Sequence, residues 1–240
     1  MNNEVGSILP VAELCGIAEG SGIPSHVDAV AALGQVPINF AATRASALSV
    51  SAHKIGGPVG VGALVLGRHT IADSLLHGGS QQRARSGSQN VAGAVAFAAA
   101  LDLALGEGRA PDPERISRLA RLRDRLIAGV RDIDPSAVLR GSSDEHARVP
   151  GNAHFTFPGC QGDSLVFLLD AAGVSVSVGS ACQAGVAEIS HVLMAMGLSE
   201  AEAAGALRFT LGPDTRETEV DSLLAALPAA IDRARSAGLN

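Results

Sequence analysis

The 240-residue sequence contains no tryptophan and no tyrosine, and its six phenylalanines bring the aromatic fraction to only 2%. A core without large rings has to be built from alanine, valine, leucine and isoleucine, and hydrophobic residues make up 47% of the chain. This supply is ample for a buried core. At this length the chain can form one large domain or two modest ones.

Cysteine is scarce as well, and Cys15, Cys160 and Cys182 are far apart in the sequence. An odd number at wide spacing favours neither a disulfide framework nor a zinc site, so no metal is expected. Cys15 belongs to a run of apolar residues at helical spacing and is interpreted as a core residue. Cys160 carries no motif, and no role is assigned to it.

The sequence has no excess of basic charge, because 18 Lys and Arg stand against 24 Asp and Glu and the formal net charge is -6. A nucleic-acid-binding surface would need a basic patch, so nucleic acid is not an expected partner. The N-terminus lacks a basic region followed by an apolar one, and the longest stretch of low charge, from Val91 to Leu105, is too short to cross a membrane. These absences predict a soluble, cytoplasmic protein.

The most informative stretch surrounds Lys54. Leu48 and Val50 predict a strand that ends at a polar triplet, and a glycine-rich turn follows Lys54. Lysine is almost never buried without a partner, whereas a desolvated lysine with a lowered pKa is the group that Schiff-base chemistry uses. Ser51 and His53, just before it, can donate hydrogen bonds to an anion. The alternative is an ordinary strand and turn with a solvated lysine.

Asp28 stands at the end of the preceding predicted strand. In an open α/β sheet the carboxyl ends of the strands line the ligand crevice, so Asp28 and Lys54 are expected at neighbouring strand ends. A lysine and a carboxylate are the two groups that pyridoxal phosphate (PLP) needs. The lysine forms an imine with it, and the acid keeps the pyridine nitrogen protonated so that the ring can accept electrons.

Two residues of the second half carry further chemistry. Cys182 lies among small and polar residues, which is typical of an exposed loop where a thiol can be deprotonated and attack; the alternative is a loop cysteine without a task. Arg208 lies early in a strand of small and apolar residues, where a guanidinium needs an anionic partner such as a carboxylate. A structural ion pair with Asp163 or Asp170 is the alternative.

The chain is expected to divide at Gly106 to Pro111, where two glycines and a proline interrupt the pattern, into residues 1–108 and residues 109–240.

Local signals in the second half predict individual elements. Pro113 is expected at the first position of a helix, and Ser199 with Glu202 is expected to form a capping box. Val174 to Val178 predicts a strand. His154 lies on another predicted strand and is interpreted as a satisfied core or edge histidine rather than a ligand.

Seven short blocks follow one another along the chain. They are Asn2-Asn3-Glu4-Val5-Gly6, His26-Val27-Asp28-Ala29, Ser51-Ala52-His53-Lys54, His77-Gly78-Gly79, Arg85-Ser86-Gly87-Ser88, Gly179-Ser180-Ala181-Cys182 and Arg208-Phe209-Thr210-Leu211-Gly212. In order and approximate spacing they resemble the cysteine desulfurases, which are PLP enzymes of the class V aminotransferase superfamily. The match runs from the first residues nearly to the last, and seven ordered blocks are far more specific than any one of them.

The resemblance implies an α/β protein of PLP fold type I. Residues 1–108 would be the C-terminal part of its large domain, a mainly parallel sheet with helices, and residues 109–240 would be the smaller α+β domain with the cysteine loop. Because the family's chain continues before the block at Asn3, the sequence is expected to be N-terminally truncated or completed by a separate chain. That segment would supply the residue stacked on the PLP ring and most of the phosphate-binding backbone, so the isolated chain is expected to bind PLP weakly and to self-associate.

The resemblance also implies roles around the cofactor. Lys54 would form the imine with PLP and act as the general base, with His53 beside it as a further catalytic residue, and Asp28 would pair with the pyridine nitrogen. Ser51 and His53 would hold the phosphate. Ser88, where the family usually has a threonine, would reach the phosphate of the neighbouring subunit.

On the substrate side, Asn3 would lie near the ring oxygen of PLP and the substrate carboxylate, and Arg208 would clamp that carboxylate. Cys182 would attack the substrate sulfur and carry it as a persulfide. One position departs from the pattern, because Ala31 stands where many members have a glutamine that bonds the ring hydroxyl.

The implied function is removal of sulfur from L-cysteine, which gives L-alanine and a persulfide on Cys182 for iron–sulfur cluster or thio-cofactor synthesis. The partners would be L-cysteine, a sulfur-acceptor or iron–sulfur scaffold protein, and a second copy of the chain in a homodimer. A selenocysteine lyase or a class V aminotransferase is the alternative within the superfamily, although a transaminase has no use for a loop thiol. The alternative outside enzymes is a catalytically silent subunit that acts in dimerisation or scaffold binding.

Overall fold

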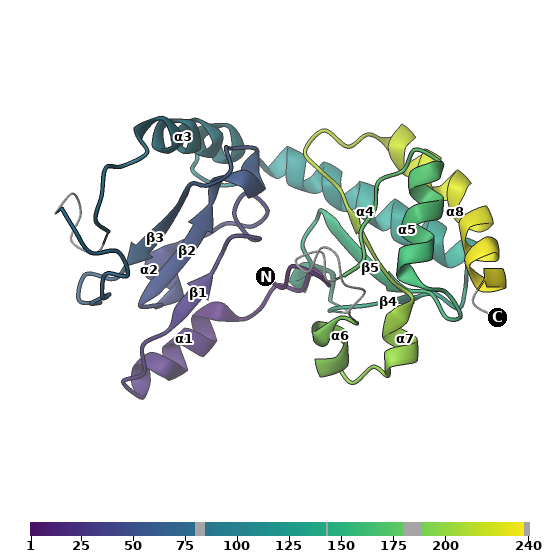
Figure 1. The fold of residues 1–240 in the computed structure, drawn as a ribbon, viewed down its shortest axis with the longest axis horizontal. Coiled ribbons are helices and arrows are strands. Elements are labelled where there is room, and N and C mark those ends of the chain that lie inside the picture. Colours follow the sequence, from purple (N-terminus) through teal and green to yellow (C-terminus); the bar gives the residue numbers. More distant parts are fainter. Residues whose placement is uncertain (80–84, 143, 180–188, 238–240) are drawn as a thin grey trace. The chain divides into compact units, whose positions relative to one another are not determined.

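The computed structural model describes four stretches of the chain, residues 1–79, 85–142, 144–179 and 189–237 (Figure 1). The chain separates into two compact units. One is Leu9–Asp112, which we call the lysine unit because it contains Lys54. The other combines Met1–Ile8 with Pro113–Asn240, and we call it the arginine unit after Arg208. Both units mix helices with strands, which confirms the predicted α/β class.

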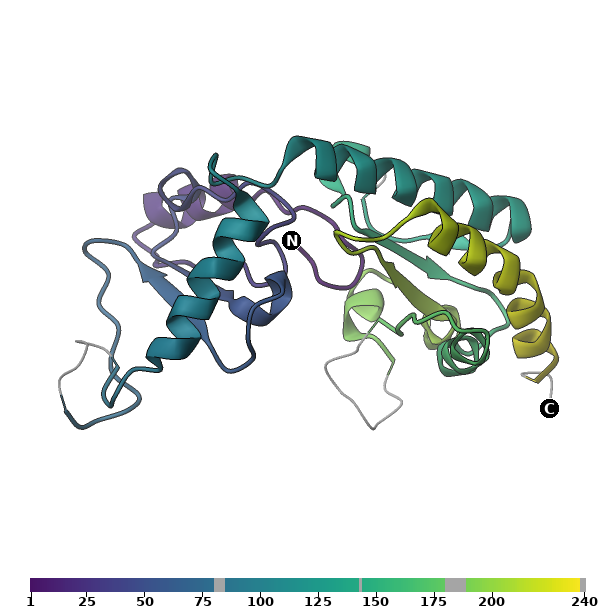
Figure 2. The ribbon, with the colours of Figure 1, turned by 90° about the horizontal axis from the view of Figure 1, so that it is seen from above.

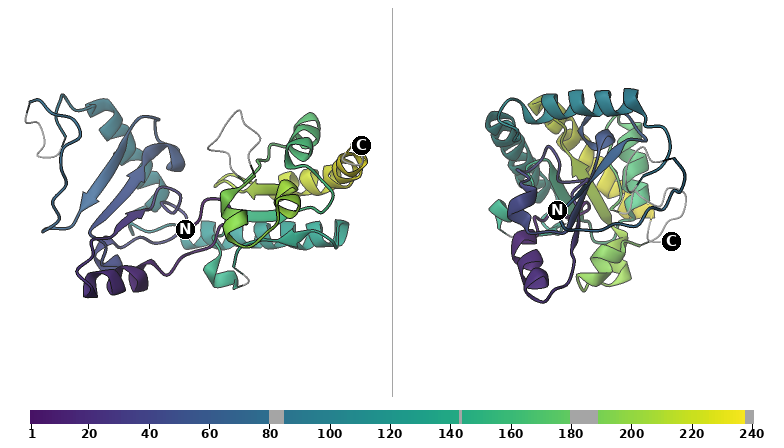
Figure 3. Two further views of the ribbon diagram at one scale, coloured as in Figure 1. Left: turned by 60° about the horizontal axis from the view of Figure 1, so that its bottom comes forward. Right: turned by 90° about the vertical axis from the view of Figure 1, so that its left-hand side faces the viewer.

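The lysine unit is built on a three-stranded sheet in the order β1-β2-β3, whose strands are seen side by side in Figure 3. Strand β1 runs parallel to β2, and β2 runs antiparallel to β3. The elements of this unit are α1 (Val11–Gly20), β1 (His26–Asp28), α2 (Phe40–Thr43), β2 (Ala47–Ser51), the 3-10 turn η1 (Ala52–Ile55), β3 (Gly62–Leu66) and α3 (Val91–Leu105). The parallel pair brings the carboxyl ends of β1 and β2 to the same edge of the sheet.

A small apolar core lies beneath the turn that follows β2. Ala52 of η1 is fully buried and belongs to one core cluster with Phe97 of α3. Gly57 has no room for a side chain, because a Cβ there would lie 2.8 Å from the Cβ of Ala52 and 3.1 Å from that of Ala100. Close packing against α3 therefore fixes the turn that carries Lys54.

Apolar side chains also remain exposed in the lysine unit. They lie on both faces of β3 and along α3, at Leu64, Val65, Val91, Val95 and Leu103. Exposed apolar side chains of this kind can be buried by association with another polypeptide.

The arginine unit is built on an antiparallel sheet in the order β4-β5-β6. Its elements are α4 (Pro113–Ile133), which begins at the predicted proline, β4 (Val138–Leu139), η2 (Glu145–Ala147), β5 (Asn152–Thr156), α5 (Gly162–Ala171), α6 (His191–Ala195), α7 (Glu200–Ala204), β6 (Ala206–Thr210) and α8 (Glu217–Ala237). Helices α4 and α8 lie side by side, and α5 packs against α8 and β6 (Figure 2). Phe155, Phe157 and Phe209 fill the core between the sheet and these helices. Within the described stretches, no helix of either unit combines the length and apolarity that a membrane span requires.

The predicted capping box is confirmed. The backbone N–H of Glu202 donates to Ser199 Oγ at 3.3 Å, and the backbone N–H of Ser199 donates to Glu202 Oε2 at 2.9 Å. The predicted strand from Val174 to Val178 is wrong. Only Ser177 pairs with β6, in a single bridge, because the chain turns at Gly179 soon afterwards.

The first residues of the sequence pack with residues that come much later. The backbone N–H of Val149 donates to the carbonyl of Gly6 at 2.9 Å, and Asn152 Nδ2 donates to the carbonyl of Glu4 at 3.1 Å. Gly6 has a φ of +72°, and a Cβ there would lie 2.9 Å from the side chain of Asn152. Glycine is therefore needed at this position for the segment to reach β5.

Candidate functional site

Four of the predicted site residues lie at one edge of the sheet of the lysine unit. Asp28 is the last residue of β1 and pairs in register with Ser49 of the parallel strand β2. Ser51 ends β2, and His53 and Lys54 follow it in η1. The structure thus brings the carboxylate, the hydroxyl, the imidazole and the amine to the carboxyl ends of two neighbouring strands.

The side chain of Lys54 is exposed, although the sequence suggested a desolvated lysine. Its exposure follows from the turn, because side chains three residues apart share one face of a 3-10 helix. Ala52 and Ile55 take the inner face and pack in the core, which leaves His53 and Lys54 on the outer face. The described part of the lysine unit therefore presents this amine to solvent.

Polar contacts organise the groups next to Lys54. Ser51 Oγ lies 2.7 Å from His53 Nδ1, and when the hydroxyl donates to this nitrogen the ring proton is on Nε2, where it can donate to an anion. The backbone N–H of Val30 donates to Asp28 Oδ1 at 2.8 Å, which fixes the carboxylate and leaves Oδ2 for a cationic partner. The arrangement offers donors for a phosphate on one strand end and an acceptor for a protonated nitrogen on the other.

Two other predicted positions lie in the lysine unit. Ser88 is exposed and stands just before α3, whose first turn is capped by Asn90. Ala31, where a glutamine is usual in the family, is half-buried in the turns that follow β1.

In the arginine unit, the two predicted substrate-binding residues meet. Arg208 Nη1 donates to the main-chain carbonyl of Asn3 at 3.0 Å. The turn that presents this carbonyl is formed by Asn2, whose Oδ1 accepts the backbone N–H groups of Glu4 and Val5, both at 2.9 Å. A guanidinium held from one side in this way is suited to binding a carboxylate by its planar fork.

The chain that leads to Cys182 begins beside Arg208. The backbone N–H of Arg208 donates to the carbonyl of Ser177 at 2.7 Å, and the N–H of Ser177 donates back to the carbonyl of Arg208 at 3.2 Å. Cys182 itself lies outside the described residues. Cys182 therefore comes five positions after a residue that is paired with the arginine.

His154 differs from its prediction in one respect. It is fully buried in β5, as expected of a core residue, but neither ring nitrogen has a hydrogen-bond partner within the described stretches. Burial, followed by the positive charges of Arg208, Arg140 and Arg148, lowers the pKa of His154 to about 4. The ring is therefore neutral at neutral pH.

Sequence reasoning also missed Glu4 and Ser190 as individual residues. Glu4 stands in the first motif block and is buried, and its Oε2 accepts a hydrogen bond from Ser190 Oγ at 2.5 Å. A buried carboxylate in a motif is a recognisable signal, but its partner lies 186 positions later and cannot be found from local sequence.

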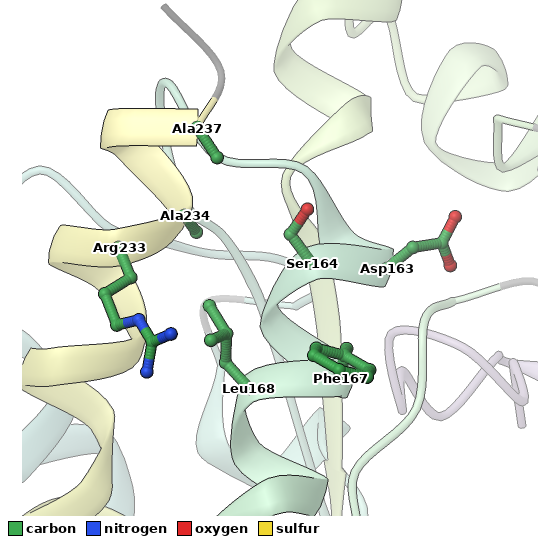
Figure 4. Close-up of a pocket in the computed structure, with 7 residues that line it drawn as sticks. All are labelled: Asp163, Ser164, Phe167, Leu168, Arg233, Ala234 and Ala237. Atoms are coloured by element: carbon green, nitrogen blue, oxygen red, sulfur yellow. The ribbon is translucent and has the colours of Figure 1, made fainter.

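A groove of about 420 Å³ lies elsewhere on the arginine unit, between α5 and α8 (Figure 4). It is lined by Asp163, Ser164, Phe167, Leu168, Arg233, Ala234 and Ala237. None of the predicted site residues lines it, and its walls are mostly apolar, so it adds nothing to the chemistry of Arg208.

Comparison with known proteins identifies the family of the chain and its fold. The family model described as Aminotransferase class-V matches residues 1–223. A protein of Mycobacterium tuberculosis (strain ATCC 25618 / H37Rv) named "IscS-like cysteine desulfurase" is 51% identical over 239 residues, which cover 99% of this chain and 60% of that protein.

Two solved structures have a similar fold. The NifS-like protein from Rickettsia africae ESF-5 gives a TM-score of 0.85 at 26% identity and covers 95% of this chain and 59% of that one. A second structure, titled as a NifS-like protein, gives 0.83 at 32% identity and covers 96% and 59%. The likeness confirms the predicted fold, that of PLP fold type I enzymes. The chain spans about three fifths of the length of each of these relatives.

Proposed function

The chain belongs to the aminotransferase class V family, and from this premise we propose that it provides catalytic residues of a PLP-dependent cysteine desulfurase. Its substrate is L-cysteine, and its products are L-alanine and a persulfide on Cys182. The observation that carries this proposal is the bridge between Ser177 and Arg208. It starts the thiol-bearing segment beside the residue best suited to hold an amino-acid carboxylate.

The residues at the strand ends of the lysine unit fit PLP. Asp28 keeps Oδ2 for the pyridine nitrogen, and Ser51 holds His53 so that its Nε2–H can donate to the phosphate. The amine of Lys54 is open to reaction in its turn. When bound, PLP supplies an electron sink for the carbon that bears the substrate amine.

Arg208 and Asn3 give the arginine unit its part in substrate binding. The guanidinium is oriented by the Asn3 carbonyl and binds the carboxylate of L-cysteine in a bidentate manner. The side chain of Asn3 is exposed next to this carbonyl and would contact the cofactor ring oxygen and the same carboxylate.

The remaining steps belong to Lys54 and Cys182. The Lys54 amine takes the proton from the substrate Cα as general base. The Cys182 thiolate attacks the substrate sulfur, so that the bond between Cβ and sulfur breaks and a sulfur–sulfur bond forms. The electron pair of the broken bond stays with Cβ, which takes up a proton and becomes the methyl group of L-alanine. One L-cysteine and one thiol thus give one L-alanine and one persulfide.

The persulfide requires an acceptor, and we propose a sulfur-acceptor or iron–sulfur scaffold protein as the partner that takes it. A homodimer is the second proposed assembly. Ser88 is exposed, and in this homodimer its hydroxyl would bind the cofactor phosphate of the neighbouring subunit.

The test is incubation of the purified chain with PLP and L-cysteine, with alanine measured by chromatography and Cys182 by peptide mass spectrometry. Alanine together with a mass increase of one sulfur on Cys182 is expected. Lys54→Ala should abolish both products, and Cys182→Ser should abolish the persulfide and alanine release. Alanine at the normal rate from Cys182→Ser would refute the desulfurase mechanism, and no alanine from the unmodified chain would favour the catalytically silent subunit.

A further inference from the structure

Three buried polar residues of the arginine unit have no part in the mechanism above. Glu4 comes from the N-terminal segment, His154 from β5 and Ser190 from the position just before α6. Their exposed fractions are 2%, 0% and 4%. Buried polar groups in a cluster are costly unless they serve a defined arrangement, so their common neighbour is informative.

That common neighbour is Gly179. A Cβ built on this glycine would lie 2.7 Å from Glu4 Oε2 and 3.1 Å from His154 Nε2. Both side chains therefore press on the same backbone position, and no larger residue fits there. Gly179 is the last described residue before the segment 180–188, which contains Cys182.

The other end of that segment contacts the same carboxylate. Ser190 Oγ donates to Glu4 Oε2 at 2.5 Å and accepts the backbone N–H of Leu193 at 3.2 Å, as the N-cap of α6. One oxygen of Glu4 thus lies against the residue that precedes the segment and is bonded to a residue that follows it.

His154 supplies the second wall beside Gly179. Its lowered pKa keeps the ring uncharged at neutral pH, so it packs beside Gly179 without adding a positive charge there. The carboxylate therefore keeps the serine hydroxyl as its hydrogen-bond donor.

We propose that Glu4 is a positioning residue, which fixes both ends of the segment that carries Cys182. The neighbouring carbonyl of Asn3 holds Arg208. Two consecutive residues thus set the carboxylate-binding guanidinium and the ends of the nucleophile's segment with respect to each other. The inference rests on the proposed function for the role of Cys182, whereas the contacts of Glu4 stand without it.

The test measures how fast iodoacetamide alkylates Cys182 in the 240-residue chain, by peptide mass spectrometry. Cys160 is the internal reference, because it is 3% exposed in the core of the same unit. Loss of this buried hydrogen bond should raise the alkylation rate of Cys182 relative to Cys160 about 10-fold in Glu4→Ala. Glu4→Gln keeps the shape and an acceptor for Ser190, so it should restore the rate to within about twofold of the unmodified chain.

Ser190→Ala gives a second test that removes only one hydroxyl, and Ser199→Ala is its matched control. Ser199 is the N-cap of α7, so this variant loses an equivalent cap without touching Glu4. Ser190→Ala should accelerate alkylation of Cys182, and Ser199→Ala should leave it unchanged. The proposal is overturned if Glu4→Ala and Ser190→Ala both leave the ratio of the two cysteines unchanged, or if Ser199→Ala raises it equally.

An activity readout separates this inference from the proposed function. Glu4→Ala should lower kcat for persulfide formation about 10-fold with little change in KM, because Arg208 is held by a main-chain oxygen that the substitution keeps. The two hypotheses can fail separately. If the unmodified chain forms no persulfide while the Glu4 and Ser190 variants change the alkylation of Cys182 as expected, the proposed function is refuted and the positioning role of Glu4 is supported.

Discussion

Arg208 and Asn3, 205 positions apart, meet through a main-chain oxygen rather than through two side chains. The orientation of the guanidinium therefore depends on the path of the N-terminal segment and not on the identity of residue 3. This separates two effects that are usually mixed when an active-site asparagine is replaced, namely loss of its own contacts and displacement of its neighbour.

Replacement of Arg208 by lysine should weaken substrate binding more than it slows chemistry. Lysine keeps the charge but loses the planar fork, so KM for L-cysteine should rise about 10- to 100-fold while kcat changes less. Steady-state alanine production measures both constants. Arg233→Lys is the control, because Arg233 lies on α8, away from Arg208 along the chain, and should change neither constant. A fall in kcat with an unchanged KM in Arg208→Lys would contradict a carboxylate-binding role.

PLP added to the purified chain should give a visible absorbance band that dialysis removes. The reason is that Lys54 and Asp28 are both exposed in the described structure, so the cofactor would be held by few contacts. The band should be absent in Lys54→Ala, since it needs the lysine amine. A stoichiometric band that survives dialysis would show that the contacts of these residues are sufficient.

Acid should destabilise the arginine unit through His154. Its folded pKa of about 4 lies below the ordinary value of 6.5, so the unfolded chain binds the proton first as pH falls. Stability is therefore complete above pH 6.5 and should fall by about 3 kcal/mol as pH drops toward 4. Urea unfolding at several pH values measures this, and His154→Gln should flatten the dependence.

The exposed His191 of the same unit provides the comparison for this experiment. His191→Gln should retain the full acid dependence. If His154→Gln and His191→Gln respond to pH alike, the buried imidazole is not the group responsible.

Gly57→Ala should disturb the turn that carries Lys54. The added methyl would meet Ala52 and Ala100 at distances shorter than normal van der Waals contact, so η1 or α3 has to move. We expect a loss of about 1–3 kcal/mol in the free energy of unfolding and weaker PLP binding. Thermal unfolding and absorbance titration measure the two effects. Gly108→Ala is the control, because a Cβ there meets none of the described residues within 4 Å.

Local chemistry explains what could be predicted from the sequence. The capping box of Ser199 and Glu202 needs only four consecutive residues, and helix α4 begins where proline is favoured. The seven motif blocks led to Asp28 and Lys54, which the structure places at neighbouring ends of parallel strands.

Other features could not be predicted because they depend on distant contacts. The exposure of Lys54 follows from which residues of a 3-10 turn find core partners. His154 has no hydrogen-bond partner among the described residues, and its packing against Gly179 depends on a distant part of the chain. The strand expected from Val174 to Val178 has the right composition, but only Ser177 comes into register with β6.

The hydrogen bonds between Gly6 and Val149 and between Glu4 and Asn152 also have a consequence for how the protein is made. The ribosome produces the N-terminal segment well before the strand that it binds, and at typical rates the delay is on the order of ten seconds. During that time the whole of the lysine unit, Leu9–Asp112, has been translated and is able to fold. The contacts of Glu4 and Gly6 can therefore form only after β5 has been translated, and the arginine unit is completed late.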